Sequence, residues 1–140
     1  MRFLLGTLAC TAILSLVGFS KASAEDLTHT KDTLDTVKKN IKEGKAQILD
    51  VREQKEWDEG HLEGAVLLPK SKLDNEKEAN ALISKLDKAK IVYTHCRGGR
   101  RALACGEILK QQGFDVRPLK QGYEELLKAG FEKAKDDKGK

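Results

Sequence analysis

The hydrophobic positions of the chain form two kinds of pattern, which alternate between residues 34 and 129. Short apolar runs predict four buried strands, and these lie at 46–51, 65–68, 91–95 and 116–119. Amphipathic spacing, with glycines at several segment ends, predicts five helices; these lie at 34–41, 53–59, 75–86, 102–112 and 123–129. Strands that alternate with helices predict an α/β fold in one domain, with a central parallel sheet flanked by helices.

Two residues place particular elements within this fold. Pro118 interrupts the fourth strand, and since proline cannot donate a ladder hydrogen bond, that strand should lie near an edge of the sheet. Trp57 is the large apolar residue of the polar segment 53–59, and we expect it to anchor that helix in the core. In parallel sheets of this kind, sites form where strands end and helices begin, so such a junction should carry the chemistry.

The first 24 residues differ from the rest of the chain. Arg2 precedes an apolar run over 3–19, and Ala22-Ser23-Ala24 has the small-x-small form of a cleavage site. This pattern predicts a signal peptide over 1–24, a domain over 25–131 and a solvated tail over 132–140. The cleaved protein would be periplasmic or secreted, with no stable membrane insertion. A retained anchor is the alternative, although the run is short for a span of about 20 residues.

Composition and charge remove several classes of protein. Charged residues make up 34% of the chain and aromatic residues 5%, while 39% are hydrophobic, which is too apolar for a disordered chain. Without Arg2 and Lys21, 24 basic and 22 acidic residues remain, and this surplus of two does not indicate a nucleic-acid partner. Beyond the leader, Cys96 and Cys105 are too few for a disulfide scaffold. No C-x2-C or H-x3-H spacing occurs, so no metal site is expected.

One junction, between the third strand and the following helix, is chemically unusual. It holds three of the five arginines that follow the leader, although a helix N-terminus favours acidic residues; they are Arg97, Arg100 and Arg101. Arginine presents a planar fork that binds oxyanions. Gly98 and Gly99 let successive backbone N–H groups point inward and form an anion nest. We therefore expect Cys96, at the start of this nest, to be held as a nucleophilic thiolate; a buried structural cysteine is the alternative.

The chain resembles the rhodanese family in a series of motifs between about residue 34 and residue 131. The matching residues are Asp50-Val51-Arg52-Glu53, Gly60-His61-Leu62-Glu63-Gly64-Ala65, Cys96-Arg97-Gly98-Gly99-Arg100-Arg101-Ala102, Gly113-Phe114-Asp115-Val116 and Gly122-Tyr123-Glu124-Glu125. The similarity is strongest to single-domain periplasmic rhodaneses. The resemblance implies a single rhodanese-like domain and thiosulfate sulfurtransferase activity, without a cofactor or metal.

The resemblance also implies roles for the loop. Cys96 would take sulfane sulfur from a donor such as thiosulfate and pass it, as a persulfide, to cyanide or a thiol. The backbone of residues 97–101 would cradle the persulfide, and Arg101, helped by Arg97 or Arg100, would attract the anionic donor. The partners are then small-molecule donors and acceptors, with a thiol redox protein as a further candidate. Asp50 and Arg52 either orient this loop from a neighbouring strand or cap that strand.

Loop length separates this activity from a related one. The rhodanese fold is shared with phosphatases and arsenate reductases whose loops resemble His-Cys-x5-Arg. Here four residues separate Cys96 from Arg101, and a five-residue spacing would need arginine at Ala102. By the family resemblance, the shorter loop implies sulfur transfer at Cys96. A phosphatase or arsenate reductase remains the alternative enzyme, and a sulfur- or oxyanion-binding module without turnover is the alternative outside catalysis.

The remaining histidines and Cys105 have structural interpretations. His95 adjoins Cys96, but adjacent strand residues point to opposite faces, so it is not expected to act as the base. Cys105 lies among apolar residues and is expected in the core, with a thiol that resolves the persulfide as the alternative. His61 is expected to make a structural hydrogen bond in its turn, and His29 lies in the lead-in to the first helix.

Overall fold

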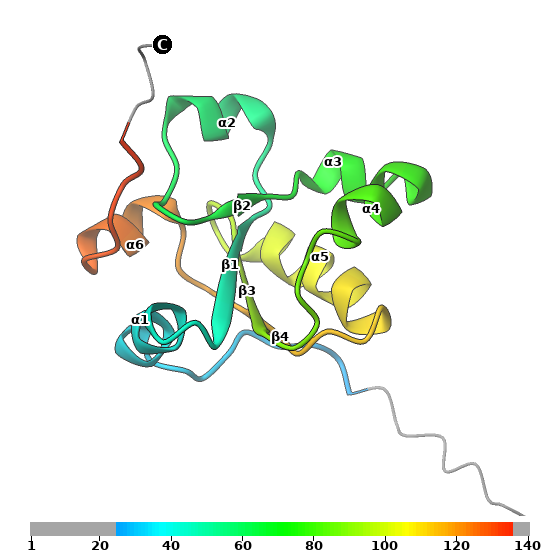
Figure 1. The fold of residues 1–140 in the computed structure, drawn as a ribbon. Helices are drawn as coiled ribbons and strands as arrows, with labels where there is room; N and C mark the ends of the chain where they lie inside the picture. The colour runs from blue at the N-terminus through cyan, green and yellow to red at the C-terminus, as the bar shows by residue number, and fades with distance from the viewer. Residues whose placement is uncertain (1–24, 136–140) are drawn as a thin grey trace, which may run out of the picture.

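Four parallel strands form the centre of the structure, a computed structural model that describes residues 25–135. They are β1 (Ala46–Asp50), β2 (Val66–Leu67), β3 (Ile91–His95) and β4 (Val116–Pro118), arranged in the order β2-β1-β3-β4 (Figure 1). The predicted α/β class and parallel sheet are therefore confirmed, and β4 lies at an edge as Pro118 indicates. β1 and β3 pair in register up to Asp50 opposite His95, so the carboxyl ends of both central strands lie side by side.

Helices cover both faces of this sheet. The described helices are α1 (Leu34–Lys42), α2 (Gln54–Glu59), α3 (Lys70–Leu73), α4 (Glu76–Ile83), α5 (Arg100–Gln111) and α6 (Tyr123–Lys128). α1 and α6 pack on one face, and α3, α4 and α5 on the other (Figure 1). α2 instead stands beyond the carboxyl end of β1, above the edge of the sheet where the site is expected.

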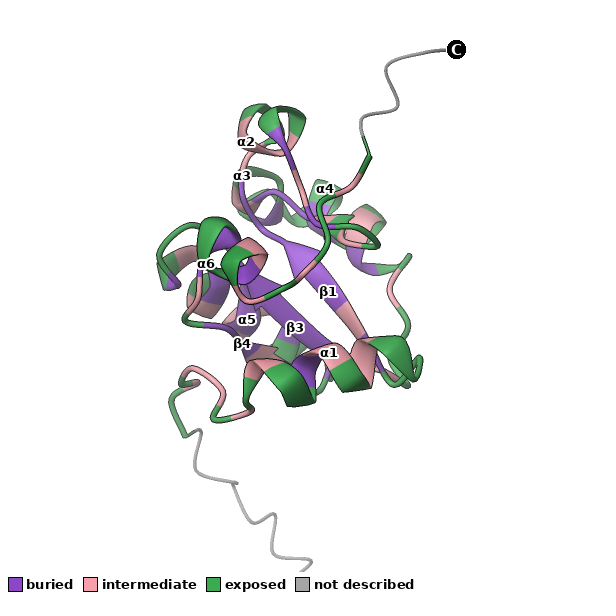
Figure 2. Ribbon diagram, turned by 90° about the vertical axis from the view of Figure 1, so that its left-hand side faces the viewer, coloured by how far each residue is buried: buried purple, intermediate pink, exposed green. Residues whose placement is uncertain are grey.

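The sheet divides the hydrophobic core into two clusters. Leu49 and Val92 face the α5 side, whereas Ile48 and Tyr93 face α1 and α6. Leu49, Val92 and Tyr93 are fully buried. Figure 2 shows that most of the ribbon along β1 and β3 is buried. Strands buried on both faces explain why their sequences are apolar runs rather than alternating patterns.

The sequence pattern did not predict one helix, and it gave the wrong burial for one aromatic residue. α3 spans only Lys70–Leu73, directly after Pro69, and four residues are too few to show helical periodicity. Trp57 is half-buried, and its ring stacks on the His61 ring with centroids 3.6 Å apart. No residue of α2 is buried, so the expectation that Trp57 anchors this helix in the core is wrong. The helix lies off the sheet and is held through polar contacts described below.

The segment expected as a solvated tail begins with an ordered pairing. Residues 132–134 lie alongside residues 61–63, where Glu63 N–H donates to the Glu132 carbonyl and Ala134 N–H donates to the His61 carbonyl. Backbone hydrogen bonds of this kind need no apolar pattern, which is why the sequence does not reveal them. The predicted signal peptide over 1–24 and residues 136–140 lie outside the described residues. No helix within residues 25–135 is long and apolar enough to cross a membrane.

Candidate active site

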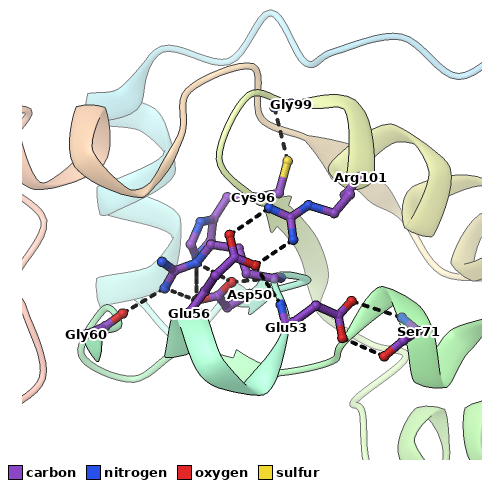
Figure 3. A network of polar contacts seen from close by, with 10 residues as sticks. Asp50, Glu53, Glu56, Gly60, Ser71, Cys96, Gly99 and Arg101 are labelled. Atoms are coloured by element: carbon purple, nitrogen blue, oxygen red, sulfur yellow. Dashed lines mark hydrogen bonds and ion pairs between the residues drawn. The ribbon is translucent and has the colours of Figure 1, made fainter. Parts of the chain in front are cut away.

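Cys96 is the first residue after β3 and lies at the carboxyl edge of the sheet. Its Sγ accepts a hydrogen bond from the Gly99 N–H, with a sulfur–nitrogen distance of 3.1 Å (Figure 3). The cysteine is only 1% exposed. Gly99 has a left-handed backbone, with φ at 88°, and begins α5 without a side-chain cap. That conformation favours glycine and turns the amide toward the sulfur, as an anion nest requires.

Neighbouring backbone fixes the ends of this loop. The Thr94 hydroxyl donates to the Ala102 carbonyl at 2.9 Å, which ties the first turn of α5 to β3. The Tyr123 N–H donates to the Cys96 carbonyl at 3.0 Å. A Cβ on Gly122 would overlap the carbonyl oxygen of Arg97, so only glycine allows this close approach. The amino end of α6 therefore supports the loop from outside.

The three loop arginines have different environments. Arg97 and Arg100 are exposed, and neither forms an ion pair within residues 25–135. Arg101 pairs with Glu56 of α2 through two contacts, Nη1 to Oε2 at 2.6 Å and Nη2 to Oε1 at 2.9 Å. Hydrogen bonding to Arg101 lowers the pKa of Glu56 to about 2. The same contact raises the pKa of Arg101 above its usual value.

Asp50 and Arg52 form a buried ion pair at the end of β1. Asp50 is fully buried and Arg52 is 6% exposed, and Arg52 Nη2 lies 2.7 Å from Asp50 Oδ2. Arg52 also donates to the Gly60 carbonyl at 2.8 Å and lies over the Tyr123 ring, 4.3 Å from its centre. Because the Tyr123 N–H binds the Cys96 carbonyl, the pair contacts the loop through Tyr123. The structure therefore shows the strand-end ion pair and its contact with Tyr123, and the support of the loop by Asp50 and Arg52 stays a prediction.

His95 faces the opposite side of the sheet from Cys96, and its Nε2 lies 3.9 Å from Asp50 Oδ2. It is fully buried and pairs with Asp50 in the sheet. It lies two residues after Tyr93, so its side chain points to the same face, the one covered by α1 and α6. Neither ring nitrogen has a hydrogen-bond partner among the described residues, and burial lowers the pKa of the ring. These observations support a neutral imidazole that does not act on Cys96.

Cys105 packs in the α5 side of the core. It is fully buried, and burial raises the pKa of its thiol to about 12, which holds it protonated and unreactive. Within residues 25–135, both cysteines, Cys96 and Cys105, are free. We predict that Cys105→Ala keeps sulfur transfer within a few-fold and lowers the free energy of unfolding by about 1 kcal/mol. Steady-state kinetics and urea denaturation check this; loss of transfer in a stable variant would indicate a resolving thiol instead.

A pocket of about 440 Å³ opens beside the loop, between α2 and the amino end of α6. Its charged lining includes three cations, Arg52, Arg97 and Lys128, and four carboxylates, Glu56, Glu59, Glu124 and Glu125. Within residues 25–135, no group of three or more histidine, cysteine or acidic side chains is placed to hold a metal ion. The site therefore contains a cysteine sulfur, a backbone N–H that points to it, and an adjoining pocket lined by both positive and negative side chains.

Sequence reasoning missed two residues that contact the loop. Glu56 reaches Arg101 across 45 positions of sequence, and its only local signal is the capping box it forms with Glu53 at the start of α2. His29 lies in the lead-in, yet its Nε2 is 3.0 Å from the Gly99 carbonyl oxygen, 70 positions away. No pattern in the sequence predicts this contact between His29 and Gly99. His61 does make the expected structural bond, through Nδ1 to the Trp57 carbonyl.

Residues 33–129 match the family model described as the Rhodanese-like domain. The match covers more than half of the chain, so the chain belongs to this family, and the resemblance drawn from the motifs is confirmed. Among solved structures, a rhodanese-related protein from Thermoplasma volcanium is similar, with a TM-score of 0.59 and 25% identity over 72% of this chain and 93% of that one. The protein hp1203 of Helicobacter pylori has a TM-score of 0.55 and 34% identity, covering 69% of this chain and 84% of its own.

Two curated relatives carry names that refer to sulfur. "Putative sulfur carrier protein YrkF" of Bacillus subtilis (strain 168) is 37% identical over 67 residues, which are 48% of this chain and 33% of YrkF. "Probable adenylyltransferase/sulfurtransferase MoeZ" of Mycobacterium tuberculosis is 35% identical over 78 residues, which are 56% of this chain and 19% of MoeZ. The chain thus spans a third or less of the length of these two relatives.

Proposed function

We propose that this protein is a sulfurtransferase that carries sulfane sulfur as a persulfide on Cys96. The observation that carries the proposal is the Cys96 loop itself, in which a nearly buried sulfur accepts the Gly99 N–H and four residues separate Cys96 from Arg101. Family membership and the sulfur-related names of the relatives support it.

The reaction we propose has two balanced steps. The Cys96 thiolate attacks the sulfane sulfur of thiosulfate, an S–S bond forms on Cys96, and sulfite leaves with the electron pair of the broken donor bond. The outer sulfur of the persulfide is then attacked by cyanide or a thiolate, which releases the Cys96 thiolate. The Gly99 N–H stabilises negative charge on Cys96 Sγ, and the exposed Arg97 and Arg100 attract the donor. Neither step needs a metal or cofactor.

We also propose that the domain acts in the periplasm or outside the cell, after the leader over 1–24 is removed. Small-molecule sulfur donors and thiophilic acceptors would then be its partners, with a thiol redox protein as a further acceptor. The proposal predicts that the purified native protein begins at Glu25, which N-terminal sequencing of the secreted fraction would check.

The function is tested by the rate of thiocyanate formation from thiosulfate and cyanide. The same preparation is assayed with a phosphate monoester and with arsenate plus a thiol, because these substrates define the alternative enzymes. Sulfur transfer without the other two activities is expected. Turnover of the phosphate monoester or arsenate, without thiocyanate formation, would contradict the proposal.

Arg101→Ala is predicted to lower kcat/KM for thiosulfate by about 10- to 150-fold, the loss of one charge-assisted contact to the donor. Arg101→Lys should lower kcat/KM less, because lysine keeps the positive charge and loses only the paired N–H donors of the guanidinium. In the alanine variant Glu56 also remains as an uncompensated negative charge beside the site. Kinetics with thiosulfate and with the singly charged methanethiosulfonate check this. Equal losses with both donors would mean that Arg101 shapes the loop and does not attract donor charge.

A further inference from the structure

The guanidinium of Arg101 is already occupied by a carboxylate. Its Nη1 and Nη2 donate to the two oxygens of Glu56 at 2.6 and 2.9 Å, the fork geometry with which arginine binds an oxyanion. Figure 3 shows this pair beside Cys96, and Arg101 interacts electrostatically with that cysteine. Both partners keep 27% of their side-chain surface exposed, so the pair lies at the mouth of the site rather than in the core.

We propose that Glu56 determines donor specificity by competing with anionic sulfur donors for Arg101. This inference rests on the proposed sulfur transfer at Cys96. A donor that binds Arg101 must displace the Glu56 carboxylate, and a donor that leaves the pair intact must approach against its negative charge. In either case the Glu56 carboxylate stays near the donor, and its repulsion increases with the negative charge of the donor. The site therefore favours sulfane-sulfur donors with one negative charge, or none, over the dianion thiosulfate.

The charged residues around the Glu56–Arg101 pair also disfavour a doubly negative donor. Glu59, Glu124 and Glu125 line the adjoining pocket together with Glu56, whereas the buried Arg52 of that pocket is already paired with Asp50. The cations left to attract a donor there are Arg97 and Lys128. These two cations share the pocket with four carboxylates, so the approach to Cys96 does not select for a doubly negative molecule.

Glu56 is charged at neutral pH. Hydrogen bonds from Arg101 and from the Glu53 N–H lower its pKa to about 2. Changing the pH around neutrality therefore does not release Arg101 from Glu56, and substitution is the direct test. In the transfer itself Glu56 forms and breaks no bond; the S–S bond to Cys96 forms, the donor S–S bond breaks, and sulfite or methanesulfinate leaves with the electron pair.

Glu56→Gln removes the charge and keeps an oxygen that can accept the Glu53 N–H. The competition predicts that kcat/KM for thiosulfate rises by about 5- to 30-fold, from the loss of one negative charge near a dianion. For methanethiosulfonate the rise should be about 2- to 5-fold, because Coulomb energy is proportional to donor charge. Asp58→Asn is the matched control: it removes one negative charge from the same helix, α2, but Asp58 neither contacts Arg101 nor lines the pocket, and both donors should stay within about twofold.

Three results would overturn the role of Glu56. The first is a fall in kcat/KM for both donors by the same factor, which would make Glu56 a positioning residue for Arg101. The second is an equal gain for both donors, and the third is an equal gain in the control variant Asp58→Asn. Thermal unfolding shows whether each variant is folded. If Glu56→Gln does not fold, Glu56→Asp decides, since its shorter side chain weakens the fork: competition predicts a gain of about 2- to 5-fold with thiosulfate, and positioning predicts a loss. If the unsubstituted protein accepts sulfur from neither donor, the proposed function fails instead.

Discussion

Replacing Cys96 by serine is expected to lower thiocyanate formation by about 10³-fold or more, because the attacking group itself is removed. A serine hydroxyl is not ionised at neutral pH and cannot form a persulfide. The substitution is nearly isosteric, and the Gly99 N–H that now binds Cys96 Sγ can bind the serine oxygen, so the loop should keep its shape. Steady-state kinetics of the folded variant measure the loss.

The matched control for this experiment is Cys105. Cys105 is fully buried in α5, and Cys105→Ala should retain sulfur transfer. A Cys96→Ser variant that forms thiocyanate at the unsubstituted rate would mean that the nucleophile lies elsewhere. Comparable losses in both cysteine variants would indicate a two-thiol mechanism.

The second large effect is expected on stability. Asp50→Ala should lower the free energy of unfolding by about 3–5 kcal/mol, because it leaves the buried Arg52 charge without its partner. Asp50 accepts the Arg52 side chain at 2.7 Å and its backbone N–H at 3.0 Å, and Arg52 in turn packs on Tyr123. The loss of this support should also reduce sulfur transfer.

Asp115→Ala provides the comparison for that measurement. Asp115 also pairs with an arginine, Arg117, but 55% of its side chain is exposed. An exposed ion pair contributes about 0.2–1 kcal/mol to the free energy of unfolding. This variant should therefore unfold at nearly the same urea concentration as the unsubstituted protein. Similar small losses in Asp50→Ala and Asp115→Ala would show that the β1 ion pair does not stabilise the fold.

The fold could be predicted wherever burial dictates composition. β3 is buried along most of its length, and its bounds, 91–95, follow from the apolar run alone. Helix α3 could not be predicted, because a four-residue helix has no periodicity. The burial of Trp57 was predicted wrongly. Its large aromatic ring suggests a core position, but α2 lies off the sheet, and the ring stacks on His61 instead.

The candidate site could be predicted only as far as it is local in sequence. Cys96 and Gly99 are three positions apart, and the glycine content of the loop already implies an amide that turns toward the sulfur. The partner of Arg101 comes from α2, and the contact of His29 comes from the lead-in; both depend on how distant segments pack. The same holds for Gly122, whose need to be glycine follows from the passing Arg97 carbonyl.

The central claim, that Cys96 carries sulfur, is tested most directly by the mass of the intact protein. Treatment with thiosulfate, followed by removal of excess donor, should add the mass of one sulfur atom, and cyanide should then restore the original mass. Peptide mapping should place the added sulfur on Cys96, and Cys96→Ser should show no change. An unchanged mass after thiosulfate, or added sulfur that maps to Cys105, would contradict the account.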